Sequence, residues 1–187
     1  MTLKEILDRA DQYANALSTK QKVSIVNELQ KKLFRTIYRI KTATSYDLVE
    51  GQFLYPLDFH PSKIISVVVD GKRYDYEDIN KEESIPPYLY TYEDSFGLYP
   101  TPEKTVKGGL IFFHYKEPAE LTAENLSAIP DFDPDFHMLL MYGLQVEMAE
   151  INEDVAMVNN FTAKYNGLLE EFKESLPEPE APTFIVE

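Results

Sequence analysis

The side chains best suited to acid–base chemistry or metal binding near neutral pH are three histidines, His60, His114 and His137. No two of them stand at metal-ligand spacing, and the chain contains no His-Glu-x-x-His motif. His60 precedes a proline in a turn, His114 falls in an expected strand, and His137 opens an expected helix. We therefore expect structural histidines, with no bound metal and no cofactor.

Three alternating carboxylates, Asp131, Asp133 and Asp135, have the spacing that begins a calcium-binding loop. Such a loop needs a glycine at its sixth position, where this chain has Phe136, and Pro134 would disrupt it. Helix capping explains these residues better. Other acidic pairs are plentiful, but none stands out as the carboxylate pair of a glycosidase.

The usual nucleophile and phosphate motifs are also missing. The chain has no cysteine, which excludes disulfides, thiolate zinc sites and cysteine nucleophiles. No serine lies in a Gly-x-Ser-x-Gly motif, and Gly108-Gly109 is expected to form a turn before a strand instead of a phosphate cradle. We expect a protein that is not an enzyme and whose task is to hold something.

A basic cluster stands out instead. Lys31, Arg35 and Arg39 are spaced to share one face of a helix, with Lys32 beside them. A solvated face and a small nucleic-acid patch are the alternatives. The hypothesis we carry forward is a charge contact with a neighbouring subunit or with another partner.

The charge of the chain is −14 and is unevenly distributed. Residues 1–41 hold nine Lys/Arg against four Asp/Glu, whereas residues 117–187 hold two against sixteen. This acidity repels a phosphate backbone and disfavours sequence-specific nucleic-acid binding. It also lets the basic first part of one copy meet the acidic last part of another. No apolar run approaches the roughly 20 residues of a membrane span.

Both ends of the chain predict paired amphipathic helices. A capping-box pattern at Thr2 begins a first helix, whose apolar residues continue to Leu17. A second such pattern at Ser18 begins another helix, which is expected to end near Lys41. A tight corner should join the two helices. Asp133 and Pro134 begin two more. Thr42-Ala43-Thr44-Ser45 is expected to be a linker.

The middle of the chain predicts strands. Residues 64–69 and 72–77 flank Asp70-Gly71, the signal of a hairpin with a type I′ turn. Residues 96–99 and 110–115 complete a small antiparallel sheet. In the strand 88–92, Tyr88, Tyr90 and Tyr92 share one face, which makes them candidates for a surface that binds another molecule.

The last eleven residues differ from the rest. Residues 177–182 are rich in proline and glutamate and should form an extended spacer. A short apolar segment that favours a β-strand follows, made of Thr183, Phe184, Ile185 and Val186. We expect this segment to dock on a partner, by adding to a sheet edge or filling a groove.

These patterns give an α+β fold in which both chain ends form a four-helix bundle-like domain. We expect an N-terminal helical half over residues 1–45, an inserted β domain over 46–118, a C-terminal helical half over 119–176 and a docking tail over 177–187.

The whole-chain layout resembles the head–tail connector, or adaptor, proteins of tailed bacteriophages. The similarity rests on segments that are individually weak but occur in the right order. They are Val26 to Arg35 (VNELQKKLFR), Gly51 to Phe59 (GQFLYPLDF), Val67 to Tyr74 (VVVDGKRY), Leu98 to Pro102 (LYPTP), Ile111 to Pro118 (IFFHYKEP), Phe136 to Leu144 (FHMLLMYGL) and Asn159 to Asn166 (NNFTAKYN).

This resemblance implies a structural protein of the virion, assembled in the host cytoplasm as a homo-oligomeric ring of about twelve copies. The ring would bind the portal, extend the channel through which genomic DNA passes, and receive the tail or tail-completion proteins. The C-terminal segment, with Thr183, Phe184, Ile185 and Val186, would reach the portal. The basic cluster would contact a neighbouring subunit or the portal, and Tyr88, Tyr90 and Tyr92 would be candidates for the platform that receives the tail. No catalytic residue, cofactor or membrane is implied. The alternatives are a non-catalytic binding module that uses the tyrosine face for a ligand or peptide, and a hydrolase with an unrecognised carboxylate pair.

Overall fold

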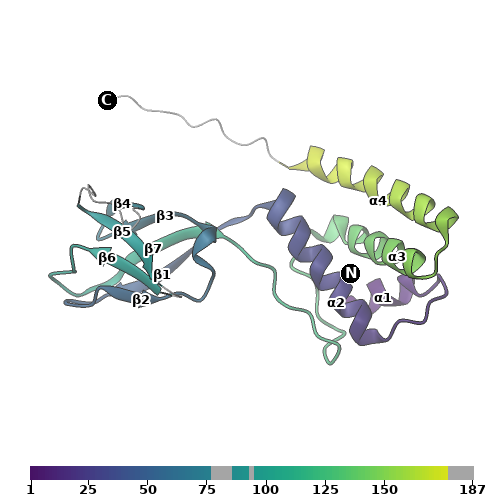
Figure 1. Ribbon diagram of the computed structural model, residues 1–187, viewed down its shortest axis with the longest axis horizontal. Coiled ribbons are helices and arrows are strands. Elements are labelled where there is room, and N and C mark those ends of the chain that lie inside the picture. The colour runs from purple at the N-terminus through teal and green to yellow at the C-terminus, as the bar shows by residue number, and fades with distance from the viewer. Residues whose placement is uncertain (77–85, 93–94, 177–187) are drawn as a thin grey trace. The chain divides into compact units, whose positions relative to one another are not determined.

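The computed structural model describes residues 1–76, 86–92 and 95–176. The chain forms two compact units (Figure 1). Met1–Arg39 and Glu117–Glu187 form the helical unit, and Ile40–Lys116 form the β unit. The fold is therefore α+β, with a sheet inserted between N-terminal and C-terminal helices, as the sequence predicts.

The first two helices begin where their capping boxes predict. Thr2 caps α1 (Leu3–Ala10) and Ser18 caps α2 (Thr19–Leu33), each with a reciprocal bond from the residue three positions on. The predicted extension of the first helix to Leu17 is wrong, and so is the tight corner. The helix ends at Ala10, because Asn15 bonds the backbone around it, accepting from the amide of Leu17 at 3.1 Å.

The second helix also ends earlier than its apolar stripe predicts. A π-helical turn, Phe34–Tyr38, follows α2, and Arg39 has left the helical conformation at φ 0° and ψ 51°. The expected linker at Thr42–Ser45 is wrong as well. These residues belong to β1 (Lys41–Leu48) because they pair with the strand that ends the β unit.

The C-terminal half contains α3 (Met138–Ile151) and α4 (Val155–Ser175). Asp133 acts as a cap, as predicted, but of a short 3-10 turn, Pro134–Phe136, that precedes α3. Asp154 caps α4 through the amide of Met157 at 3.1 Å. None of the helices among the described residues is long and apolar enough to cross a membrane.

Packing in the helical unit is centred on α3, which contacts α1, α2 and α4. Gly143 of α3 allows the closest approach, since a Cβ there would lie 2.8 Å from Leu29 Cδ1. An aromatic cluster closes one end of this core. Its members are Phe34, Tyr38, Phe132, Phe136 and Phe172.

An ion pair between a buried lysine and an exposed aspartate follows α1. Lys22 Nζ lies 2.6 Å from Asp11 Oδ1, with the lysine side chain 9% exposed and the aspartate 42%. Desolvation would raise the pKa of Asp11, but hydrogen bonds from Lys22 and Asn15 and the charge of Lys22 outweigh it and lower this pKa below 3.8.

We expect Asp11→Asn to destabilise the protein by about 1 kcal/mol at neutral pH, a value reduced for the exposure of Asp11. Because the folded-state pKa is lowered, the stabilisation is complete above the unfolded pKa and disappears as the pH falls through the folded one. Urea denaturation at several pH values should show the difference from wild type shrinking below about pH 4. Asp8→Asn, in an exposed pair with Lys4, is the control and should change little; a difference that grows on acidification would contradict the assignment.

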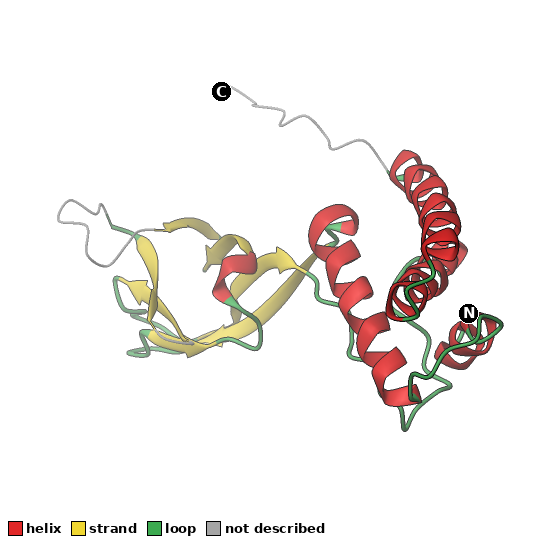
Figure 2. Ribbon diagram, turned by 45° about the vertical axis from the view of Figure 1, so that its right-hand side comes forward, coloured by secondary structure: helices red, strands yellow, loops and turns green. Residues whose placement is uncertain are grey.

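The β unit is one seven-stranded curled sheet in the order β1-β7-β3-β4-β5-β6-β2 (Figure 2). Besides β1, the strands are β2 (Leu54–Pro56), β3 (Ile64–Val69), β4 (Lys72–Tyr76), β5 (Tyr88–Tyr92), β6 (Ser95–Tyr99) and β7 (Val106–Tyr115). The predicted antiparallel sheet is corrected to a mixed one, because β4 and β5 are parallel. The predicted hairpin is confirmed, with positive φ at Asp70 (48°) and Gly71 (78°).

One more turn is corrected. Gly108-Gly109 lies inside β7 instead of preceding it, since β7 begins at Val106. Gly108 has φ 62°, where glycine is favoured, and its amide donates to Asp47 Oδ1 at 2.7 Å. The pairing of β7 with β1 shifts register in this region.

The concave side of the sheet holds the core of the β unit. Val67, Leu89, Phe96, Leu110 and Phe112 are its central side chains, all 2% exposed or less. Because side chains alternate along a strand, the neighbours of these residues point outward.

Candidate functional site: uncharged outer faces of the sheet

The outward face of β5, β6 and β2 carries no charged side chain in its paired rows. Tyr88 is opposite Tyr99, Tyr90 is opposite Gly97, and Tyr92 is opposite Ser95. Strand β2 extends two of these rows, pairing Leu54 with Gly97 and Pro56 with Ser95. We call Tyr88, Tyr90, Tyr92, Tyr99, Gly97 and Leu54 the tyrosine surface.

The tyrosine rings are ordered by one another and by a glycine. Tyr88 and Tyr99 stack with centroids 5.1 Å apart and planes inclined by 28°. The ring of Tyr90 lies against Gly97, where a Cβ would come within 2.2 Å of it. Tyr92 and Tyr99 remain about half exposed, at 53% and 49%. Enrichment in tyrosine and lack of charge are typical of the centre of a protein–protein interface.

The placement of Tyr88, Tyr90 and Tyr92 on one outward face agrees with the alternation in the sequence. Sequence reasoning missed Gly97 and Tyr99. Tyr99 ends a predicted strand, but only the register across the hairpin places it on Tyr88. The Leu98-Tyr99-Pro100 sequence contains no local signal that indicates its pairing with Tyr88.

We expect Gly97→Ala to displace the Tyr90 ring, because the new methyl group would occupy its position. The fold should persist with a loss of about 1–3 kcal/mol. Thermal melting measures the loss, and NMR of the tyrosine rings measures the displacement. Gly167→Ala is the control, since Gly167 in α4 has open space around its Cβ position. It should gain about 0.5–1 kcal/mol. Unchanged Tyr90 resonances in Gly97→Ala would contradict the packing described here.

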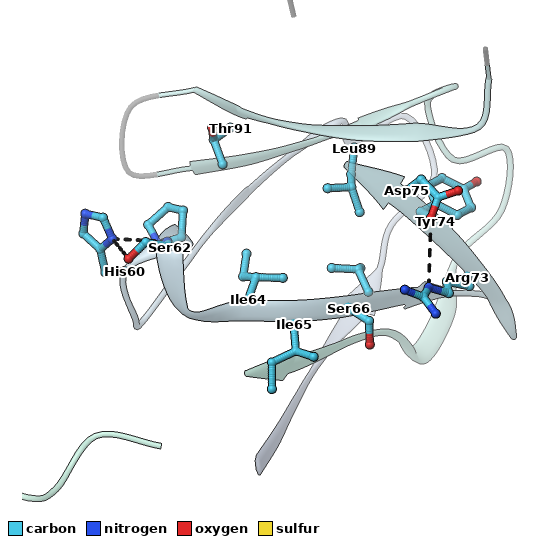
Figure 3. A pocket seen from close by; sticks show the side chains of 12 residues that line it. His60, Ser62, Ile64, Ile65, Ser66, Arg73, Tyr74, Asp75, Leu89 and Thr91 are labelled. Atoms are coloured by element: carbon cyan, nitrogen blue, oxygen red, sulfur yellow. Dashed lines mark hydrogen bonds and ion pairs between the residues drawn. The ribbon is translucent and has the colours of Figure 1, made fainter. Parts of the chain in front are cut away.

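A pocket of about 640 Å³ opens beside the inner face, between β3 and β5 (Figure 3). Ile64 and Leu89 point into it, whereas Ile65 and Ser66 point to the other side of β3. His60 and Ser62 lie at one end, and Arg73 and Asp75 at the other.

The polar groups of this pocket bond to one another. His60 Nδ1 lies 2.8 Å from Ser62 Oγ and 3.2 Å from the Ser62 amide, so it caps a short turn. Arg73 Nε lies 4.0 Å from Asp75 Oδ1. Burial and the nearby Asp70 carboxylate raise the pKa of Tyr74, so its hydroxyl stays protonated. The apolar side chains of this pocket can bind apolar groups, and the His60 and Ser62 side chains are engaged in capping the turn Pro61–Lys63.

The other two histidines make hydrogen bonds within the fold. His114 Nε2 lies 2.8 Å from Thr44 Oγ1, and its ring stacks on Phe59 at 3.7 Å. His137 is fully buried, with Nε2 2.8 Å from the Phe132 carbonyl and Nδ1 2.8 Å from the amine of Met1. Within the described residues no three His, Asp or Glu side chains gather as metal ligands.

The basic cluster lies in the helical unit, but its members do not continue one regular helix face. Lys31 and Lys32 end α2, Arg35 lies in the π-helical turn, and Arg39 follows it. All four side chains are exposed. Lys31 lies 4.0 Å from Glu28 of its own helix. Their contact with another molecule stays a prediction.

Thr183, Phe184, Ile185 and Val186 lie outside the described residues. Their docking on a portal also stays a prediction.

The family model described as "SU10 adaptor protein" matches residues 1–182, nearly the whole chain. No curated protein matches the chain.

Proposed function

Since the chain belongs to the SU10 adaptor protein family, we propose that it is a structural subunit of a ring that joins the portal of a phage capsid to the tail. The observation that carries this proposal is the family match over residues 1–182. Membership suggests a phage adaptor role, a structural and non-catalytic protein, and a place in the virion. Assembly as a ring of about twelve copies, around a channel for DNA, is the finer part of the proposal.

Charge supports passage of DNA through such a ring. A conduit must not hold the phosphate backbone, and a chain of net charge −14 repels it. The same charge is unevenly distributed, so the exposed Lys31, Lys32, Arg35 and Arg39 can meet carboxylates of α3 and α4 of another copy or of the portal. We propose this contact as one that speeds assembly and weakens with salt.

The C-terminal segment is proposed as the tether to the portal. Residues 177–182 would span roughly 19 Å if extended as polyproline. Thr183 to Val186 would then reach a sheet edge or groove of the portal, where main-chain hydrogen bonds give affinity.

The test is assembly on purified portal rings, imaged by electron microscopy. We expect the full chain to form a ring on the portal. A chain lacking residues 177–187 should keep its melting temperature, because it retains every described helix and strand up to the end of α4 at Ser175, and should bind the portal more weakly. If the shortened chain binds the portal with wild-type affinity, the C-terminal segment is not the tether. If the full chain forms no ring on the portal, the adaptor proposal is wrong.

The tyrosine surface favours a second reading, a module that binds a peptide or another ligand without catalysis. Its uncharged aromatic rows suit such a partner. Within an adaptor the same surface would receive another virion protein, and the sequence interpretation assigns it to the tail. Glycan or peptide arrays that bind the isolated protein with micromolar affinity would support the second reading.

A further inference from the structure

A second uncharged area lies on the outward face of the other half of the sheet. In one row Ala43 of β1, Phe113 of β7 and Ser66 of β3 are paired across the sheet. In the next row the pairing brings together Ser45, Ile111 and Val68. We call this area, together with Ile65 beside it, the Phe113 surface.

The apolar side chains of the Phe113 surface reach solvent. Phe113 is 39% exposed while its neighbour Phe112 is fully buried, and Ile65, at the register shift between Ile64 and Ser66, is 37% exposed. The alternation along β7 shows that Phe113 lies on the outward face and not over a gap in the core. An exposed apolar area of this kind, in a chain with 27% charged residues, indicates an interaction site.

Strand β4 separates the two surfaces. In the register of the sheet, Val68 of the Phe113 surface is paired with Arg73, and Asp75 is paired with Tyr88 of the tyrosine surface. The side chains of Arg73 and Asp75 are 72% and 85% exposed and lie 4.0 Å apart. Each copy therefore carries two different uncharged surfaces with a charged boundary between them.

The charges next to the two surfaces are opposite in sign. Two exposed lysines, Lys41 and Lys107, lie on β1 and β7 beside the Phe113 surface, with Asp47 held by the amide of Gly108. The tyrosine surface has the 85% exposed Asp75 beside it, paired with Tyr88. Charges of opposite sign around two apolar areas favour their mutual contact and fix its register.

We infer that the tyrosine surface of one copy packs on the Phe113 surface of a second copy. A ring requires contacts between two different surfaces of the same chain, repeated head to tail, and a pair of unlike, complementary surfaces on one small unit meets that requirement. A tail protein would use one surface and leave the other unexplained. This inference rests on the proposed ring function and names the subunit contact within it.

Site-specific cross-linking tests the contact, because the chain has no cysteine of its own. We expect a mixture of Tyr90→Cys and Phe113→Cys proteins to form a covalent dimer on mild oxidation, and each protein alone to form little. A chain carrying both substitutions should give a ladder of larger products. Tyr99→Cys with Ile65→Cys is a second pair, should either first variant fold poorly.

Lys72→Cys is the matched control, since Lys72 is exposed and lies on neither surface. Cross-linking of Lys72→Cys with Phe113→Cys at the same rate as the Tyr90 pair would overturn the inference. So would faster dimerisation of Tyr90→Cys with itself, which would make the tyrosine surface a two-fold contact.

Ring formation by surface variants on purified portals distinguishes a failure of this inference from a failure of the adaptor proposal. If Tyr90→Glu and Phe113→Glu each still form rings on the portal, the contact is wrong while the adaptor function stands. If Tyr90→Glu forms rings but no longer receives the tail, the tyrosine surface belongs to the tail protein. The positive result is loss of ring formation in both variants, with circular dichroism and melting close to wild type.

Discussion

Replacement of Phe112 by alanine is expected to unfold much of the β unit, with a loss of about 3–5 kcal/mol. Phe112 is fully buried and contacts aromatic rings from three other parts of the unit. Its centroid lies 4.7 Å from that of Phe96, 5.6 Å from Tyr46 and 6.0 Å from Phe59. The cavity left by alanine would remove all three contacts at once.

The control for this change is the next residue. Phe113 has the same side chain on the same strand but points outward and is 39% exposed. Phe113→Ala should cost about 1 kcal/mol or less. Urea denaturation of the full chain at low concentration, followed by far-ultraviolet circular dichroism, measures both values. Equal losses for the two variants would mean that the inner and outer faces of β7 are assigned wrongly.

Features that depend on near neighbours in sequence were predictable. The capping boxes at Thr2 and Ser18 need residues three positions apart, and the Asp70-Gly71 hairpin needs only its two strands. The alternation of Tyr88, Tyr90 and Tyr92 required only the strand period. The family resemblance, too, came from segments in order along the chain, and the family match confirms it.

Features that depend on distant partners were not predictable. Strand β1 has a polar sequence with little apolar alternation, and it is a strand because Lys41 to Tyr46 pair with residues 110–115. The parallel pairing of β4 with β5 has no local signal either. Gly97 and Tyr99 complete the tyrosine surface only through the register across a hairpin.

The ends of the predicted helices failed for a different reason. Apolar spacing continues past Ala10 to Leu17, but the Asn15 side chain also donates to the Tyr13 carbonyl at 3.1 Å and so competes with helical bonding. Spacing alone cannot show which bond a polar side chain makes. The same limit applies to Asn27, whose position in a predicted helix gave no sign of its role.

Asn27 fastens the segment after the sheet to α2. Its side-chain amide donates to the Leu121 carbonyl at 2.8 Å and its oxygen accepts from the Leu121 amide at 3.0 Å, and Asn27 itself is 6% exposed. Backbone bonds from Leu3 and Lys4 to the carbonyls of Ala128 and Leu126 hold the same segment against α1. The segment has no regular structure of its own before the 3-10 turn at Pro134.

We expect Asn27→Ala to destabilise the helical unit by roughly 2–5 kcal/mol, because it leaves a buried amide and a buried carbonyl of Leu121 without their partner.

Gln30→Met is the informative comparison. Gln30 is as deeply buried but makes one bond, to the Ala119 carbonyl at 3.0 Å, while its own oxygen has no partner. Removing that lone oxygen offsets part of the loss, so Gln30→Met should cost less. Glu28→Ala, exposed on the same helix, should stay within about 0.5 kcal/mol of wild type. Urea denaturation ranks the three variants, and amide hydrogen exchange at Leu121 should rise in Asn27→Ala alone; a loss in Asn27→Ala no greater than in Glu28→Ala would show that the segment is held without this side chain.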